Sequence, residues 1–168
     1  MSVNEPSSRT KVLPWVSFAA RLILGGGLLV AGLRKIVDLP QSVLAVRAYE
    51  FPISDAMESF LGNALPIVEI LLGLLILVGL FPRWTALLGG LSMLAYITVI
   101  ISAWARGLSI DCGCFTPGGF LGPDQKTQYG IDIARDLGFL VCAVWLVVLP
   151  ASRLSLGAWM QSSQEKES

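Results

Sequence analysis

The sequence predicts an all-α integral membrane protein, folded as a four-helix up-down-up-down bundle with a cysteine-bearing loop between its third and fourth helices. Three observations support this fold class. Of the 168 residues, 54% are hydrophobic and only 14% are charged, whereas soluble domains carry about 25% charged residues. The mean hydropathy is +0.70. Four long apolar runs follow one another, and they do not alternate as strands of a membrane barrel do.

Each apolar run is long enough to cross a membrane as a helix. The first, residues 12–33, would extend about 33 Å at about 1.5 Å per residue, which exceeds the roughly 30 Å of a hydrocarbon core. The other three expected spans, at residues 64–80, 84–105 and 131–149, fall within the roughly 17–25 residues of a membrane-spanning helix. A polar N-terminal tail (1–11) and a polar C-terminal tail (151–168) would flank one four-span membrane domain (12–150).

The connections between these runs differ in kind. Phe81-Pro82-Arg83 predicts a tight turn, so the second and third spans should be antiparallel neighbours. The long first connection contains Gln41–Tyr49, whose apolar spacing predicts a short helix at the membrane interface. The third connection, residues 106–130, holds two cysteines and a proline- and glycine-rich stretch that indicates turns rather than helix.

An even number of spans places both termini on one side of the membrane, and charge does not identify that side. Basic residues are divided evenly between the two sides, so the positive-inside rule does not predict the orientation. Because disulfides persist outside the cytoplasm, we expect the cysteine loop to face outward from the cell (inner) membrane and both termini to be cytoplasmic. The net charge of zero suggests no nucleic-acid partner, and the apolar composition makes membrane lipid the expected partner.

Asp-Cys-Gly-Cys-Phe at 111–115 is the strongest chemical signal in the sequence, because it places Cys112 and Cys114 one residue apart. An extended chain would strain the Cα separation of about 4.4–6.8 Å that a disulfide prefers, and Gly113 permits the necessary bend. A strained disulfide is labile, as a transfer site requires, whereas so short a bridge adds little stability. The spacing therefore favours thiol–disulfide exchange.

Other interpretations of the cysteines stay open from the residues alone. The pair could be loop cysteines without a role, or it could capture a soft metal such as Cu(I) or Zn(II). The sequence has no histidine and no Cys-X-X-Cys pair, so a zinc site would lack ligands, and neither metal nor haem is expected. Cys142 lies inside the fourth run, where a cysteine usually packs as a small buried residue. Its alternative role is a resolving thiol.

Charged residues within the spans form a second set of candidates, since ionisable groups are costly in lipid and usually face the bundle interior. Glu69 and Arg135 lie at about the same depth from the surface that carries the cysteine loop. We expect them to contact each other, or Arg34 and Asp136. Glu69 could accept a proton beside a thiol or quinol. The alternative is a purely structural network of salt bridges.

Several motifs together resemble a known family. Arg-Leu-Ile-Leu-Gly-Gly-Gly (21–27), Ala-Gly-Leu-Arg-Lys (31–35) and Leu-Pro-Ile-Val-Glu-Ile-Leu-Leu-Gly (65–73) resemble the first two spans of DoxX-like membrane proteins. The stretch at 106–115, followed by Ile-Ala-Arg-Asp-Leu (133–137), resembles the methylamine utilisation protein MauE branch of that family. The resemblance implies a four-span inner-membrane protein associated with redox chemistry. Its relatives are linked with quinone oxidoreduction and with maturation of a disulfide-rich periplasmic protein.

The resemblance also indicates which residues occupy recurring family positions. The catalytic candidates are Cys112, Cys114, Asp111 and Glu69, and the supporting charges are Arg21, Arg34, Lys35, Arg106, Arg135 and Asp136. An anionic Asp111 should disfavour the thiolate of its neighbour, whereas Arg106 should favour it. Cys114, which is farther from Asp111, is therefore the preferred reactive thiol.

The leading hypothesis is a membrane thiol–disulfide oxidoreductase that acts on an extracytoplasmic, thioredoxin-like or disulfide-containing partner. Exchange would pass through a mixed disulfide, and reoxidation would need an acceptor, either a quinone in the bundle or another redox protein. Two other classes of function remain. One is a non-enzymatic scaffold or chaperone for a soluble oxidoreductase, and the other is a soft-metal handling protein.

Overall fold

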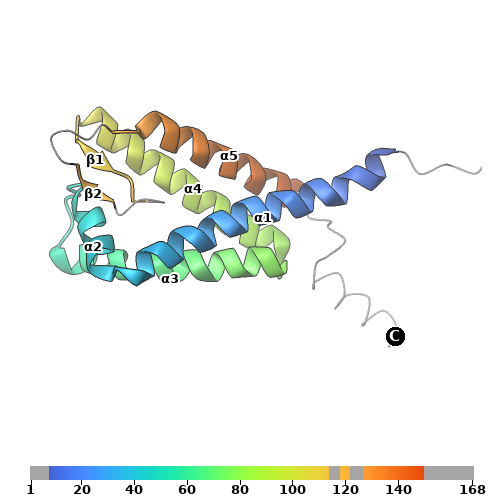
Figure 1. The fold of residues 1–168 in the computed structure, drawn as a ribbon, viewed down its shortest axis with the longest axis horizontal. Helices are drawn as coiled ribbons and strands as arrows, with labels where there is room; N and C mark the ends of the chain where they lie inside the picture. The colour runs from blue at the N-terminus through green and yellow to red at the C-terminus, as the bar shows by residue number, and fades with distance from the viewer. Residues whose placement is uncertain (1–7, 114–117, 122–126, 150–168) are drawn as a thin grey trace, which may run out of the picture.

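The computed structural model of the protein describes residues 8–113, 118–121 and 127–149, and this part of the chain is mostly helical (Figure 1). In chain order the elements are α1 (Ser8–Val37), α2 (Leu39–Arg47), α3 (Asp55–Val78), α4 (Pro82–Ala105), β1 (Ile110–Asp111), β2 (Gly119–Phe120) and α5 (Tyr129–Val148). The expectation of a mostly helical fold is confirmed. The two strands form a small antiparallel sheet, which is an addition to the all-α prediction.

Within the described residues, three helices are long and apolar enough to cross a membrane, which indicates a membrane protein. They are Leu13–Val37 of α1, the whole of α3 and the whole of α4. The helix α5 differs from them because Asp132, Arg135 and Asp136 lie in its first two turns. A fourth crossing by α5, and with it the four-span bundle, stays a prediction.

Helix ends depart from the apolar runs where capping groups set the boundary. α3 begins well before the apolar run at 64, because the Ser54 hydroxyl accepts a backbone N–H of the first turn at 3.4 Å. It ends at Gly79, whose φ of 75° is left-handed. Pro82 is then the first residue of α4, where its missing N–H is harmless. The turn is therefore 79–81 and not the expected 81–83.

The long helices pack as two pairs, α1 with α3 and α4 with α5, and α1 also contacts α5 (Figure 1). At the α1–α3 contact the two backbones meet directly. A Cβ built on Gly73 would lie 2.8 Å from the carbonyl oxygen of Gly25 and 2.8 Å from the backbone nitrogen of Leu29. Small residues permit such close approach between membrane helices. The core between the pairs is apolar and includes Leu24, Leu28, Ile76, Met93 and Leu146.

We expect Gly73→Ala to destabilise the protein by about 1–3 kcal/mol, the usual cost of adding a methyl group to a packed interior. The methyl group would meet backbone atoms of Gly25 and Leu29, which can move only if α1 and α3 separate. Gly26→Ala is the matched control, since a Cβ there meets nothing within 4 Å and alanine is the better helix former. Unfolding in mixed micelles measures both variants, and equal stabilities would contradict the direct backbone contact.

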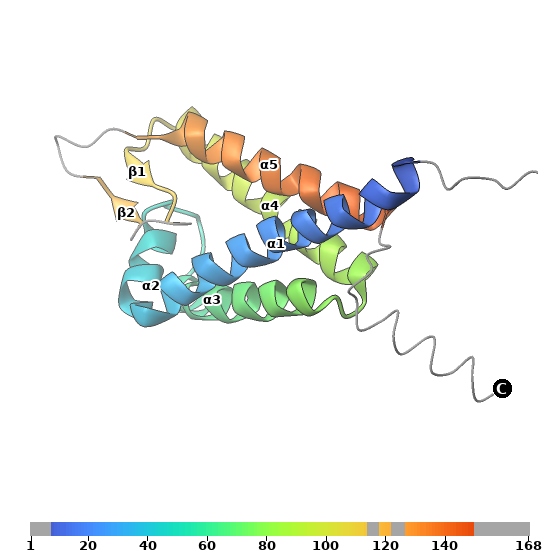
Figure 2. The same cartoon turned by 45° about the vertical axis from the view of Figure 1, so that its right-hand side comes forward.

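The two helix pairs diverge toward the end of the molecule that carries α2 and the sheet (Figure 2). α2 packs on α3 at this end, where the Ser42 hydroxyl donates to the carbonyl oxygen of Gly62 at 2.8 Å. A second buried cluster joins α4, β1 and the start of α5 there, and it consists of Ala48, Tyr49, Ile100, Ala103, Ile110, Cys112 and Tyr129. Cys112 thus lies at the open end, between the two helix pairs.

Candidate functional site

Cys112 directly follows β1, and only 8% of it is exposed. The chain bends at this point, because Oδ1 of Asp111 accepts the backbone N–H of Gly113 at 3.0 Å. Gly113 takes a φ of 70°, a conformation that favours glycine. The Tyr49 hydroxyl donates to the carbonyl oxygen of Cys112 at 3.4 Å. Cys114 lies outside the described residues.

Gly118, which directly precedes β2, is held against Gly113 and against α2. A Cβ on Gly118 would lie 2.6 Å from the Cα of Gly113 and 2.8 Å from the Cβ of Ala45, so only glycine fits at this approach. Gln41 donates from Nε2 to the carbonyl oxygen of Gly118 at 2.8 Å. These contacts fix the backbone beside Cys112 on α2.

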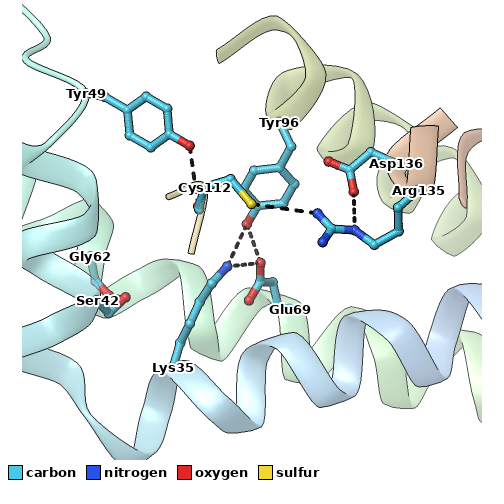
Figure 3. A network of polar contacts seen from close by, with 9 residues as sticks. All are labelled: Lys35, Ser42, Tyr49, Gly62, Glu69, Tyr96, Cys112, Arg135 and Asp136. Atoms are coloured by element: carbon cyan, nitrogen blue, oxygen red, sulfur yellow. Dashed lines mark hydrogen bonds and ion pairs between the residues drawn. The ribbon is translucent and has the colours of Figure 1, made fainter. Parts of the chain in front are cut away.

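The positive charge beside the Cys112 thiol comes from Arg135 in α5. Its Nη2 lies 3.8 Å from the sulfur, and a nearby guanidinium favours the thiolate form of a cysteine. The same guanidinium donates from Nη1 to Asp132 and from Nε to Asp136, each at 3.0 Å. Arg135 is therefore oriented by two carboxylates, and one of its nitrogens faces the sulfur (Figure 3).

The sequence suggested that role for Arg106, and the structure places the Arg106 guanidinium on backbone carbonyl groups. Arg106 donates from Nη2 to the carbonyl oxygen of Tyr49 at 2.6 Å and from Nη1 to that of Glu50 at 3.3 Å. Its guanidinium also lies 5.8 Å from the ring centroid of Phe51. Arg106 thus fastens the segment that follows α2 to the end of α4.

A second polar cluster lies between α1, α3 and α4. Lys35 donates from Nζ to Oε1 of Glu69 at 2.6 Å and to the hydroxyl of Tyr96 at 3.4 Å, and the Tyr96 hydroxyl donates to the same Oε1. The partner of Glu69 is therefore Lys35 and not the expected Arg135 or Arg34. The expected contact between Arg135 and Asp136 is present. Figure 3 shows Cys112 between this cluster and Arg135.

A cavity of about 650 Å³ lies beside Cys112 and the Lys35–Tyr96 side of the second cluster. Polar groups in its wall include Lys35, Tyr96 and Cys112, and most of the remaining wall is apolar, as at Phe51 and Leu65. Binding sites for small organic molecules have this size and this composition, an apolar lining with a few polar groups. The cavity can therefore take an apolar molecule whose polar atoms meet Lys35 and whose body reaches the Cys112 thiol.

The remaining candidates are distributed unevenly around this cavity. Arg34 is exposed and lines it. Arg21 is buried in α1, about 21 Å along the helix from Lys35, so the structure does not bring it to the site. Cys142 carries a free thiol against the apolar core, about 10 Å along α5 from Arg135.

Tyr96 is the site residue that sequence reasoning missed. Its hydroxyl contacts both charged members of the Lys35–Glu69 pair, and Lys35 lies 5.0 Å from its ring centroid. A signal for it exists in the sequence, because a tyrosine in the middle of an apolar span needs a partner for its hydroxyl. Within the described residues, no group of three or more His, Cys, Asp or Glu side chains is placed to hold a metal ion.

Comparison with known proteins gives one family. The family described as Methylamine utilisation protein MauE matches residues 13–149 of the chain. No curated protein and no solved structure matches it.

Proposed function

We propose that this chain, which belongs to the MauE family, is a membrane protein that exchanges disulfides with an extracytoplasmic partner through Cys112 and Cys114. One observation carries the proposal: the Cys112 thiol lies in the wall of the 650 Å³ cavity with a guanidinium nitrogen 3.8 Å away. A cysteine beside a cation has the setting of a reactive thiol. The partner is a disulfide-forming protein, and not methylamine itself.

The exchange would run in two balanced steps. In the first, a thiolate of the partner attacks the Cys112–Cys114 disulfide and forms a mixed disulfide, and the partner's second thiol then displaces the chain's cysteine. The partner leaves with a disulfide, and Cys112 and Cys114 hold two electrons and two protons as thiols. Arg135 stabilises the Cys112 thiolate in this step and in its reversal, because its charge faces the sulfur.

The second step restores the disulfide, and the cavity suggests the acceptor. A quinone bound there would accept the two electrons and two protons that the dithiol loses. The apolar walls suit a ring with an isoprenoid chain, and the Lys35 ammonium supplies donors for a carbonyl oxygen. Lys35 is oriented for this task by Glu69 and Tyr96.

The proposal includes a fourth membrane crossing by α5. Leu137, Val141, Val144 and Val148 are exposed along one side of this helix, at the spacing of one helical face. Its charged residues instead meet one another and Cys112. An apolar outer face with inward charges is the arrangement that a lipid-facing helix requires.

We expect the cysteine end of the molecule to face outward and the α3–α4 turn to face the cytoplasm. The disulfide chemistry requires this orientation, since disulfides persist outside the cytoplasm. Single cysteines at two exposed positions test it in a variant that lacks the natural cysteines: Ser109→Cys beside β1 and Phe81→Cys in the turn. A membrane-impermeant maleimide should label the first in intact cells and the second only after lysis. The reverse pattern would contradict the orientation.

The experiment that tests the proposed function is trapping of the mixed disulfide in cells. With Cys112→Ser, Cys114 can still attack a partner, but no second thiol in the loop can resolve the product. Mass spectrometry should identify a peptide of an extracytoplasmic protein joined to Cys114, and the same complex should vanish when both cysteines are replaced. Non-covalent binding that survives in the double variant would favour the scaffold hypothesis instead.

A further inference from the structure

Glu69 and Asp136 each pair one carboxylate oxygen with a cation, and the second carboxylate oxygen of each residue is buried. Oε1 of Glu69 receives Lys35 and Tyr96, and Oδ1 of Asp136 receives Arg135. The second oxygens, Oε2 of Glu69 and Oδ2 of Asp136, are buried and have no hydrogen-bond partner among the described residues. The two residues are only 3% and 2% exposed, so bulk water does not serve these oxygens.

Both carboxylates line one small cavity, which we term the carboxyl chamber. Its walls are formed by Gly27, Leu28, Ala31, Glu69, Met93, Tyr96, Asp136 and Phe139, and its volume is about 10 Å³. A cavity needs about 10–15 Å³ and at least two polar partners to hold one water molecule. The chamber meets the lower limit of volume and has polar groups from three helices.

The charges around the chamber do not cancel. Lys35 from α1 pairs with Glu69, and Arg135 from α5 pairs with Asp136. Arg135 also pairs with Asp132, which is the third carboxylate of the group. Two cations therefore face three anions. Tyr96 from α4 is the remaining titratable group at the chamber. Arg34 lies on the large cavity, and Arg21 is about 10 Å along α1 from Leu28. An uncompensated charge inside a membrane protein is costly, and one bound proton removes it.

We propose that the carboxyl chamber binds one water molecule and one exchangeable proton, shared between Glu69 and Asp136. The protonated carboxyl group donates a hydrogen bond to this water, and the water donates one to the other, ionised carboxylate. Both unpartnered oxygens then have a hydrogen-bond partner. Glu69 also touches Tyr96, which lines the large cavity as well as the chamber. The chamber is thus a store of one proton, connected through Glu69 and Tyr96 to the cavity that contains Cys112.

The use of this proton rests on the proposed function, whereas its presence does not. When the two cysteines return to a disulfide, two protons leave with two electrons. The store returns one proton to the cavity through Tyr96 and is refilled by one of those that the thiols release. Asp136 ends the path, because its other contact is Arg135, which stays protonated.

Infrared spectroscopy of the protein in lipid nanodiscs tests the proposal without an activity assay. At neutral pH we expect one protonated carboxyl band per protein, which shifts in heavy water. The band should disappear in Glu69→Gln and in Asp136→Asn. Glu58→Gln is the matched control: Glu58 is also buried in α3 but pairs with Arg47 and lines neither cavity, so the band should remain.

The spectrum of the unaltered protein decides the question even if a chamber variant fails to fold. Absence of a protonated carboxyl band at neutral pH would overturn the proposal, and so would a band that persists in both chamber variants. Cys112→Ser separates this proposal from the proposed function. The carboxyl band should be unchanged in Cys112→Ser. If the unaltered protein shows the band but does not exchange disulfides, the proposed function fails and the chamber proposal stands. If it exchanges disulfides but lacks the band, the chamber proposal fails and the proposed function stands.

Discussion

Replacing Cys112 by serine is expected to lower the rate of disulfide exchange at least about 1,000-fold, to the level of a protein without loop cysteines. Serine keeps the size of the side chain but cannot form a disulfide. It also leaves the guanidinium of Arg135 without the sulfur that lies 3.8 Å away. The measurement is oxidation of a dithiol peptide by purified protein in nanodiscs, with a quinone present.

Two matched variants make this prediction specific. Cys114→Ser should be as inactive as Cys112→Ser, and the double variant should be no worse than either, because one missing cysteine already stops exchange. Cys142→Ser should keep nearly full activity, since that free thiol packs in the core away from the cavity. Full activity of the double variant would remove the oxidoreductase hypothesis.

Lys35→Met is expected to destabilise the protein by about 3–5 kcal/mol, the usual cost of leaving one member of a buried ion pair alone. Glu69, which is 3% exposed, would lose its ammonium partner in the bundle interior. Adding Glu69→Gln should restore most of the loss, because the carboxylate that Lys35 pairs with is then absent. Unfolding in mixed micelles measures the cycle.

A second ion pair provides the control for this result. Arg47 pairs with Glu58 at 3.3 Å, but its side chain is 44% exposed. An ion pair with one exposed member contributes less than a pair buried on both sides, so Arg47→Met should destabilise the protein less than Lys35→Met. If Lys35→Met lowers the free energy of unfolding no more than Arg47→Met does, water reaches the Lys35–Glu69 pair, and the pair is not buried in the bundle interior.

The helices could be predicted because hydropathy alone fixes most of them. The apolar runs locate α1, α3, α4 and α5, since a bilayer requires long apolar helices. Hydropathy did not predict the early start of α3, because its first turns carry polar residues such as Asp55 and Glu58. The Ser54 cap sets the start of this helix, and the apolar run does not. The two-residue strands were beyond prediction, because they depend on contacts between the loop and α2.

The candidate site could be predicted as a set of residues, but not as a set of pairs. Arg106 is close to Cys112 in sequence, yet Arg135 meets its sulfur, because the start of α5 returns beside β1. Glu69 was expected to contact Arg135 or Arg34, yet it meets Lys35. One position on a helix turns a side chain by about 100°, so the choice between Arg34 and Lys35 depends on how α1 packs on α3. That packing is a property of the whole fold.

The most direct test of the central claim is whether the reduced loop cysteines give their electrons to a quinone. Purified protein in nanodiscs is reduced, freed of reductant, and mixed without oxygen with a short-chain benzoquinone, and the quinone absorbance is followed. We predict the loss of one quinone per protein, with no loss for Cys112→Ser. An unchanged absorbance, with both cysteines still present as thiols, would contradict the account.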